Sequence, residues 1–391
     1  MYVGKISNKL LKILLPLIVL SVGFGQVTKE GKPYSFHHDL QREIPVVQLP
    51  KVDVESLLLE DENRPDGTPF RYGVSLPIDL KLQNPDYWEK LPDGKQIWRK
   101  QIESDGAFAL SLKFDRFYLP KNTTLFVYTP DKKTVHGAYT ELNNNPDDIF
   151  ATPLVPGDKI IIEIVVSPNE EQIELSSAKV IHDYRDFFNF FGSQGNRSCG
   201  ENVACPDADP YEEQVDATAW LEMNGWICSG SMINNANYDQ TPYFLTAWHC
   251  VDGLSPGSFR FYFNYETSGC SGNSANYGSY AYGSTLRASS NGMDPDFALL
   301  EITGTIYDSW NVYYAGWNRS SSSPYISCGI HHPGGDPKKI NYDNDLASNS
   351  GGINWNNGGY SPPGSHWGVA WDEGGTEGGS SGSPVFDENK R

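Results

Sequence analysis

Short apolar runs separated by turn residues make up most of the chain. In its first half, residues 107–114 (AFALSLKF) alternate between apolar and polar positions, and residues 124–128 (TLFVY) and 159–166 (KIIIEIVV) are nearly continuous apolar stretches. Runs of this length that are rich in β-branched and aromatic residues predict β-strands. Because turn residues separate them, we expect a β-sandwich-like domain over residues 65–182.

The second half continues this pattern on a background of Gly, Ser and Asn. Residues 243–247 (YFLTA), 259–264 (FRFYFN) and 297–302 (FALLEI) are strand-like, and long helical periodicity is absent. An all-β barrel or sandwich is therefore the predicted fold class. The polar, proline-containing residues 26–64 are expected to be extended, and residues 183–198 (DYRDFFNFFGSQGNRS) are typical of a connector.

The N-terminus has the pattern of a secretory signal peptide. Lys5, Lys9 and Lys12 form a basic start, an apolar run covers residues 13–22, and small residues precede a cleavage point near Gly25. A membrane anchor is the alternative, but the run is short for a bilayer and a proline interrupts it. The sequence therefore predicts a secreted, extracellular protein that is not bound to a membrane after signal cleavage.

Charge and cysteine content agree with export. The 391 residues include 30 Lys and Arg against 49 Asp and Glu, a formal net charge of −19, which disfavours nucleic acid and anionic lipid as partners. All six cysteines lie from position 199 onward. In an exported chain an even number of cysteines predicts disulfides, and their confinement to one half predicts a domain boundary just before them.

Three residues have the types and surroundings that nucleophilic hydrolysis by a serine requires. His249 lies in LTAWHC, Asp296 in DPDFALL and Ser381 in GGSSGSP. A hydroxyl must attack, an imidazole must take and return its proton, and a half-buried carboxylate must orient the imidazole. Asp294 competes with Asp296 for the last role. The order His, Asp, Ser is that of the chymotrypsin family and not of subtilisin or the α/β-hydrolases.

The glycines around the candidate nucleophile predict an oxyanion hole. Small residues allow a sharp turn, and the amides of Gly379 and Ser381 are candidates for binding the tetrahedral oxyanion. Taken alone, the segment is also compatible with a flexible Gly/Ser linker. An esterase with a Gly-x-Ser-x-Gly nucleophile elbow is disfavoured, because position 383 is Ser.

Several further segments resemble the trypsin/chymotrypsin superfamily of serine proteases, and within it the lysyl endopeptidase branch. The resemblance covers residues 199–391 and includes 199–205 (CGENVAC), 243–250, 296–302, 315–317 (AGW), 330–333 (IHHP) and 376–384 (TEGGSSGSP). It implies two antiparallel β-barrels with the three candidate residues between them. It also implies a division into a signal peptide (1–25), a propeptide (26–192) and a trypsin-like protease domain (193–391).

The resemblance further implies a cysteine pairing and a substrate. The expected disulfides are Cys228–Cys250 and Cys205–Cys270. The family pattern implies a partner for Cys199 beyond Arg391 and has no counterpart of Cys328, so the pairing of these two stays open, although a bridge between them would make the count even. The implied reaction is hydrolysis of a peptide bond after lysine, with the substrate peptide and the chain's own propeptide as partners. No cofactor is implied.

Three departures from the superfamily pattern bear on activation and specificity. Ser380 stands where many trypsin-like enzymes carry the Asp that pairs with a new N-terminus, so activation is not expected to need a buried N-terminal charge. Gly375 stands at the position of the specificity acid of trypsin, which leaves Glu377 as a weak candidate for contacting a cationic side chain. The chain ends at Arg391, so we expect a second barrel with missing strands and weak or absent activity.

Two other interpretations follow from the sequence. A non-catalytic pseudo-protease or binding module on the same fold is the alternative function, since the strands that line the specificity pocket would lie beyond Arg391. The pair His331-His332 is not expected to bind a metal, because adjacent residues of a strand point to opposite faces.

Overall fold

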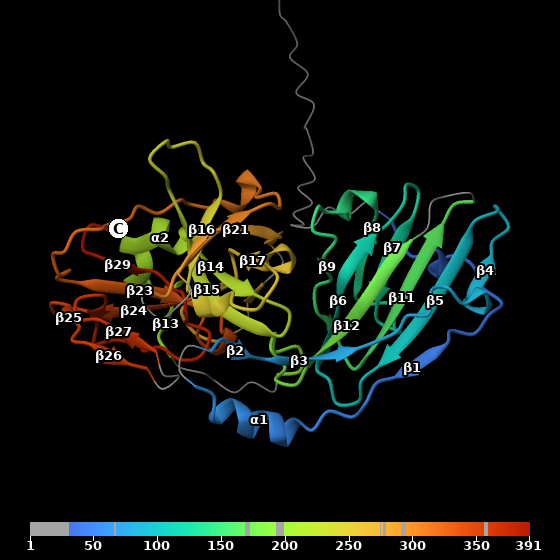
Figure 1. Cartoon of the computed structure of the whole chain (residues 1–391), viewed down its shortest axis with the longest axis horizontal. Helices are drawn as coiled ribbons and strands as arrows, with labels where there is room; N and C mark the ends of the chain where they lie inside the picture. The colour runs from blue at the N-terminus through green and yellow to red at the C-terminus, as the bar shows by residue number, and fades with distance from the viewer. Residues whose placement is uncertain are drawn as a thin grey trace, which may run out of the picture.

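Two β-rich units lie side by side in the computed structural model of the chain, the N-terminal one blue to green and the C-terminal one yellow to red (Figure 1). The structure describes residues 31–391 except 66–67, 169–172, 193–198, 274, 277–278, 291–294 and 356–358. The predicted signal peptide, the predicted cleavage segment from residue 193 onward and Asp294 therefore lie outside the described residues. In the described part, no helix is both long enough and apolar enough to span a bilayer.

The N-terminal unit is a sandwich of two sheets. One has the order β1 (Val46–Gln48), β5 (Gln96–Glu103), β11 (Lys159–Val166), β7 (Thr124–Tyr128), β8 (Val135–Tyr139), with β4 (Trp88–Lys90) also on β5. The other has the order β10 (Val155–Pro156), β6 (Ala109–Tyr118), β12 (Glu174–Asp183), β3 (Gly73–Pro77), with β9 (Phe150–Ala151) on β6. The strand runs predicted at 107–114, 124–128 and 159–166 correspond to β6, β7 and β11.

The core of this unit lies between the two sheets. Trp98 and Ile162 from the first sheet and Leu112, Phe114 and Val180 from the second are each fully buried in one apolar cluster. β11 is buried along almost its whole length because β5 and β7 flank it and apolar residues cover it, which explains why its run is nearly all apolar, with Glu163 as the exception within it.

The expectation of an extended segment over residues 26–64 is wrong for its last part, which forms helix α1 (Val54–Glu62). The Asp53 side chain accepts a hydrogen bond from the Ser56 amide at 3.2 Å and so caps the first turn. At the other end, the Asp61 carboxylate lies 2.8 Å from Arg71 Nε and 2.7 Å from Arg185. An N-cap aspartate followed by Glu55 in the first turn was the signal for this helix.

The C-terminal unit begins with a curled sheet that forms the first barrel. Within the described residues its order is β20 (Tyr280–Tyr282), β17 (Arg260–Tyr262), β14 (Thr218–Glu222), β15 (Trp226–Ile233), β16 (Tyr243–Thr246), β22 (Ala298–Ile302), β21 (Ser284–Ser289). All its pairings are antiparallel. Leu221, Phe244, Phe261 and Leu300 fill its interior.

A second sheet packs beside the first barrel. Its order is β13 (Glu201–Asn202), β24 (Lys339–Asp343), β23 (Ser327–His331), β29 (Val385–Phe386). Short hairpins and one short helix complete the unit: β18 (Glu266–Thr267) with β19 (Ala275–Asn276), β25 (Ser348–Asn349) with β28 (Trp367–Gly368), β26 (Ile353–Asn354) with β27 (Tyr360–Ser361), and α2 (Glu212–Ala217). The fold is all-β and chymotrypsin-like, as predicted.

Several single turns of 3-10 helix connect the strands. They are η1 (Tyr34–Phe36), η2 (Pro85–Tyr87), η3 (Glu141–Asn143), η4 (Pro206–Tyr211), η5 (Trp248–Cys250), η6 (Pro256–Ser258), η7 (Asp308–Trp310) and η8 (Pro333–Gly335).

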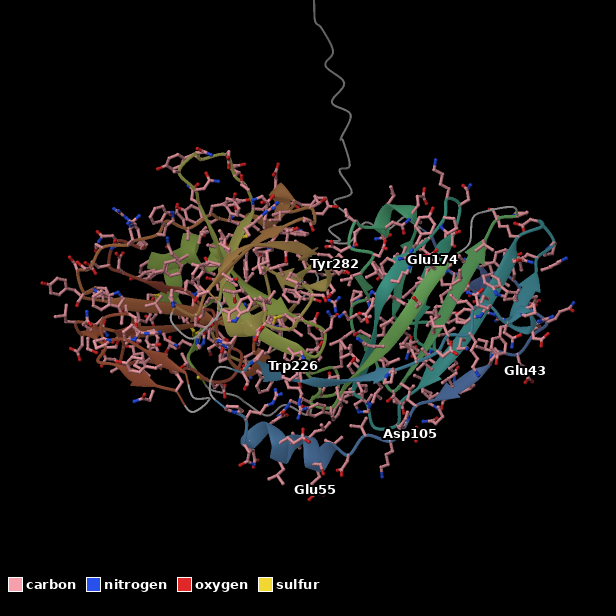
Figure 2. The ribbon with its side chains drawn as sticks, in the orientation of Figure 1. Glu43, Glu55, Asp105, Glu174, Trp226 and Tyr282 are labelled. Carbon is pink, nitrogen blue, oxygen red and sulfur yellow. A yellow bond between two sulfur atoms is a disulfide. The ribbon has the colours of Figure 1, made fainter. Side chains whose placement is uncertain are left out.

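The two units share a continuous interface. Strand β2 (Phe70–Arg71) leaves the N-terminal unit and pairs antiparallel with β15, so that Phe70 lies opposite Ile227 and Arg71 opposite Trp226. Figure 2 shows Trp226 and Tyr282 on the side of the barrel that faces the sandwich. The Ala151 amide of β9 donates to the Tyr282 hydroxyl at 2.8 Å. Backbone pairing and side-chain contacts therefore hold the N-terminal unit against the first barrel.

Candidate active site

Strand pairing in the first barrel brings two of the predicted site residues together. His249 lies in η5, directly after β16, and Asp296 lies directly before β22. Because β16 and β22 are antiparallel neighbours with Thr246 opposite Ala298, the end of one strand meets the start of the other. His249 Nδ1 lies 2.5 Å from Asp296 Oδ2, and the His249 amide donates to Oδ1 at 2.9 Å.

The carboxylate is held in the charged form that a triad acid needs. Burial alone would raise the pKa of Asp296, but hydrogen bonds from the His249 ring and from the His249 and Trp248 amides outweigh it and hold the pKa below the usual value. The bond also fixes the other ring nitrogen as the one free to act. Within the described part of the chain, His249 Nε2 is buried and has no hydrogen-bond partner.

Ser381 lies beside this pair, on a turn anchored to β15. Its carbonyl accepts a hydrogen bond from the Ser229 amide at 2.8 Å, and Cys250 Sγ lies 3.8 Å from the same oxygen. The Cys228–Cys250 disulfide thus joins the histidine turn to the strand that holds the serine turn. Among the described residues, Ser381 Oγ makes no hydrogen bond to His249 Nε2. Such bonds are often long in the absence of substrate.

The two candidate oxyanion amides beside Ser381 belong to peptides whose carbonyls are hydrogen-bonded elsewhere. The Gly378 carbonyl accepts from the Gly334 amide at 2.6 Å, and the Ser380 carbonyl accepts from the Ser383 amide at 3.0 Å. In a planar trans peptide the N–H points opposite to the C=O, so the Gly379 and Ser381 amides point away from these partners. Neither amide is hydrogen-bonded to a described residue, which leaves both available to a ligand.

Gly379 adopts a conformation that suits glycine. Its φ is +97°, and a Cβ atom there would lie 2.8 Å from the His332 carbonyl oxygen and 2.9 Å from Ile227 Cδ1. The absence of a side chain at this position therefore permits the close packing that sets the direction of its amide.

Both expected disulfides are present, and the two remaining cysteines are not bridged. Cys205–Cys270 and Cys228–Cys250 are formed. The suggested bridge between Cys199 and Cys328 is wrong, because both are free thiols. Cys328 is buried in β23, and burial raises the pKa of its thiol to about 12.

The residues proposed for the specificity pocket lie on the segment that leads to Ser381. The Gly375 carbonyl accepts from Asn341 Nδ2 at 2.7 Å, whereas Glu377 is exposed and its amide donates to Ser380 Oγ at 3.2 Å. His331 and His332 bind different partners: His331 Nδ1 lies 2.7 Å from Ser380 Oγ, and His332 Nδ1 lies 3.0 Å from the Asp336 carbonyl oxygen.

Sequence reasoning missed the residues that support this turn from behind. The Ser229 hydroxyl accepts from the His332 amide at 2.9 Å and donates to the Gly379 carbonyl at 2.9 Å. Asn341 reaches the turn from β24. Neither residue stands in a motif, so a single sequence carried no signal for them.

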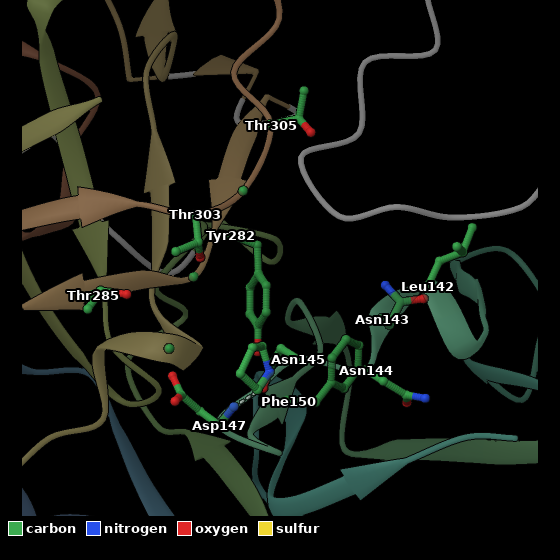
Figure 3. Close-up of a pocket in the computed structure, with 14 residues that line it drawn as sticks. Leu142, Asn143, Asn144, Asn145, Asp147, Phe150, Tyr282, Thr285, Thr303 and Thr305 are labelled. Carbon is green, nitrogen blue, oxygen red and sulfur yellow. Dashed lines mark hydrogen bonds between the residues drawn. The ribbon is translucent and has the colours of Figure 1, made fainter. Parts of the chain in front are cut away.

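A separate pocket of about 350 Å³ lies between the two units. Figure 3 shows Leu142, Asn145 and Phe150 of the sandwich on one side and Tyr282 and Thr303 of the barrel on the other. His249, Asp296 and Ser381 do not line it. The candidate active site is therefore distinct from this cavity.

Two models of known protein families match this chain. The family model described as the lysyl endopeptidase C-terminal domain matches residues 193–391, about half of the sequence. The chain belongs to the lysyl endopeptidase family. A second model, the lysyl endopeptidase N-terminal domain, matches residues 49–182. The two lysyl endopeptidase matches thus cover both β-rich units.

One curated relative is the lysyl endopeptidase of Pseudomonas aeruginosa, which is 27% identical over 310 residues, or 71% of this chain. The chain spans 64% of the length of that relative. Solved structures with some likeness include a thermostable serine protease of an extremophilic microorganism (19% identity, TM-score 0.30, 44% of this chain and 78% of that one) and a Glu endopeptidase in complex with MPD (16% identity, TM-score 0.30, 49% and 81%).

Proposed function

We propose that the chain is a serine endopeptidase that hydrolyses peptide bonds through an acyl-enzyme. Ser381 is the nucleophile, His249 takes and returns its proton, Asp296 orients His249, and the Gly379 and Ser381 amides bind the oxyanion. The observation that carries the proposal is the 2.5 Å contact between His249 Nδ1 and Asp296 Oδ2, with Nε2 left free beside the serine turn. Membership of the lysyl endopeptidase family supports the same reaction.

The proposed substrate is a protein or peptide that is cleaved after lysine. Support comes from the family and from the name of the Pseudomonas aeruginosa relative. Glu377, which is exposed on the segment that leads to Ser381, is the proposed contact for the lysine ammonium group. Mapping cleavage sites in a peptide library tests this specificity, and cuts that ignore lysine would contradict it.

We propose further that the N-terminal unit is a propeptide of an exported enzyme, with signal cleavage near residue 25. Strand β2 pairs with Trp226 and Ile227 of β15, and Ile227 directly precedes Cys228, which forms the disulfide to the histidine turn. A Cβ atom at Gly378 would lie 2.7 Å from Phe70 Cδ2, so the Phe70 ring packs directly against the segment that precedes the oxyanion turn. The N-terminal unit therefore covers one edge of the proposed cleft.

Removal of the propeptide is proposed to occur between residues 191 and 198. N-terminal sequencing of the protein recovered from culture medium tests this proposal. Active material with an intact junction would contradict it.

Covalent labelling with a fluorophosphonate tests the proposed reaction directly. We expect labelling of the wild-type chain that disappears in Ser381→Ala and in His249→Ala, because both the hydroxyl and its base are needed. The control is Ser383→Ala, two residues away, which is expected to be labelled like the wild type. Labelling that persists in Ser381→Ala would contradict the proposal.

A non-catalytic binding module on the same fold is the second candidate. The observation that favours it is the lack of a direct hydrogen bond between Ser381 Oγ and His249 Nε2 among the described residues. A chain that no fluorophosphonate labels, although it is folded and binds peptides, would favour this second candidate.

A further inference from the structure

A buried histidine contacts the residue that immediately precedes the proposed nucleophile. His331 ends strand β23, is 1% exposed, and places Nδ1 at 2.7 Å from Ser380 Oγ. Ser380 is itself 6% exposed. The other ring nitrogen, Nε2, lies 3.2 Å from Asn341 Oδ1 on the neighbouring strand β24. The histidine therefore connects the turn that carries Ser381 to the second sheet.

Donors and acceptors fix the direction of every hydrogen bond in this chain. The Gly375 carbonyl can only accept, so Asn341 Nδ2 donates to it at 2.7 Å, and Asn341 Oδ1 accepts from His331 Nε2–H. In the neutral ring Nδ1 is then an acceptor, so Ser380 Oγ donates to it while it accepts from the Glu377 amide at 3.2 Å. This order requires a neutral imidazole with its proton on Nε2.

The surroundings of His331 favour that neutral form. Burial lowers the pKa of His331 to about 4, and the nearby Lys339 charge acts in the same direction. A neutral ring that accepts at one nitrogen and donates at the other satisfies both sides of the chain.

Residues at the same end of the second sheet also bind the Gly378–Gly379 peptide, whose amide is one of the two proposed oxyanion donors. Three residues after His331, the Gly334 amide binds the Gly378 carbonyl at 2.6 Å, and the His332 amide binds Ser229, which in turn binds the Gly379 carbonyl. Ser380 lies between the two oxyanion amides. Among the described residues, Ser380 is the one residue of the Gly379–Ser381 tripeptide whose side chain forms a hydrogen bond to this sheet.

We propose that His331 is a positioning residue for the reaction: through Ser380 it holds the Gly379 and Ser381 amides in their oxyanion-binding orientation by a chain of neutral hydrogen bonds. The inference rests on the proposed function. It also gives a physical reason why the turn that carries Ser381 can hold its shape although Ser380 cannot form the ion pair that an Asp forms at this position in many trypsin-like enzymes. A rigid neutral chain orients dipoles without the cost of burying a charge.

The test compares kinetics of His331→Ala, Ser380→Ala and the double variant on a chromogenic peptide substrate. Complete loss of one oxyanion donor costs about 10²–10³ in kcat, so a loosened donor is expected to lower kcat about 10- to 100-fold. KM should change less than about twofold, because the substrate contacts remain. The double variant should lose no more than the worse single variant, since both break one chain.

Two further variants separate positioning from general stability. His331→Asn retains an acceptor near the place of Nδ1 and is expected to recover part of kcat. Cys328→Ala is the matched control: Cys328 stays in the enzyme after propeptide removal, is fully buried in the same strand β23, and packs in an apolar cluster with Ile330 and Phe386. This control is expected to lose stability to a similar extent, whereas its kcat should stay at the wild-type value.

The amide resonances of Gly379 and residue 381 in ¹⁵N-labelled full-length protein provide a readout that needs no turnover. They should move in His331→Ala and Ser380→Ala and stay in place in Cys328→Ala. Unmoved resonances, additive kinetic losses, or equal kcat losses in His331→Ala and Cys328→Ala would overturn the inference. A wild-type chain that no fluorophosphonate labels would instead overturn the proposed function, and the resonances would still decide the role of His331.

Discussion

The contact between the two units depends on a buried cluster that Tyr72 completes. Its hydroxyl donates to Glu222 Oε1 at 2.5 Å, and Glu222 Oε2 lies 2.7 Å from Arg260, with both charged side chains 1% exposed. Burial and the Glu222 charge raise the pKa of Tyr72 well above its usual value, so the hydroxyl stays protonated and donates. We predict that Tyr72→Phe destabilises the full-length chain.

The expected magnitude follows from the chemistry of the deleted atom. The ring is kept and its stacking on Phe187, with centroids 4.4 Å apart, is preserved, so the change removes one hydrogen bond to a buried carboxylate. Such bonds contribute about 1.5–3 kcal/mol, and we expect a loss in this range. Tyr282→Phe removes a hydroxyl at the same interface that binds only the neutral Ala151 amide, so a loss of about 0.5–1.5 kcal/mol is expected.

Urea unfolding at pH 7 measures both losses, in a Ser381→Ala background that prevents autolysis. Glu222→Gln, alone and combined with Tyr72→Phe, completes a double-mutant cycle, and the coupling energy should account for most of the Tyr72→Phe effect. If Tyr72→Phe costs no more than Tyr282→Phe, or if the two cluster mutations are additive, the charged hydrogen bond does not stabilise the interface and the reasoning is refuted.

Three other predictions concern acid, the disulfide and the oxyanion turn. Burial lowers the pKa of His182 and of His331 from 6.5 to about 4, so the unfolded chain binds more protons between these values. Stability should therefore be full above pH 6.5 and fall towards pH 4, by at most about 3 kcal/mol for each histidine, and His182→Phe should flatten the fall seen by urea titration. Replacing Cys228 and Cys250 by Ala opens a loop with a sequence separation of 22 and should cost about 3 kcal/mol, which thermal unfolding would detect. Gly379→Ala should lower kcat at least about tenfold at nearly constant KM, because the added Cβ would press on the His332 carbonyl, and unchanged kinetics would contradict the described packing.

The sequence by itself determined the strands and the chemistry of the candidate site. The runs that became β6, β7 and β11 were visible because local apolar pattern and β-propensity act within a few residues. His249, Asp296 and Ser381 could be predicted as site residues because each stands in a distinctive local context and their order along the chain is informative. Helix α1 was also encoded locally, in the Asp53 cap, and its signal was overlooked.

The tertiary structure alone decided what supports that site. Ser229, His331 and Asn341 come from different strands, and only the packing of the second sheet on the first barrel brings them to one turn. The pairing of β2 with β15 and the Tyr72–Glu222–Arg260 cluster likewise join residues far apart in the chain. The physical reason is that propensity and motif depend on neighbouring residues, whereas hydrogen bonds between distant strands depend on how whole sheets are placed.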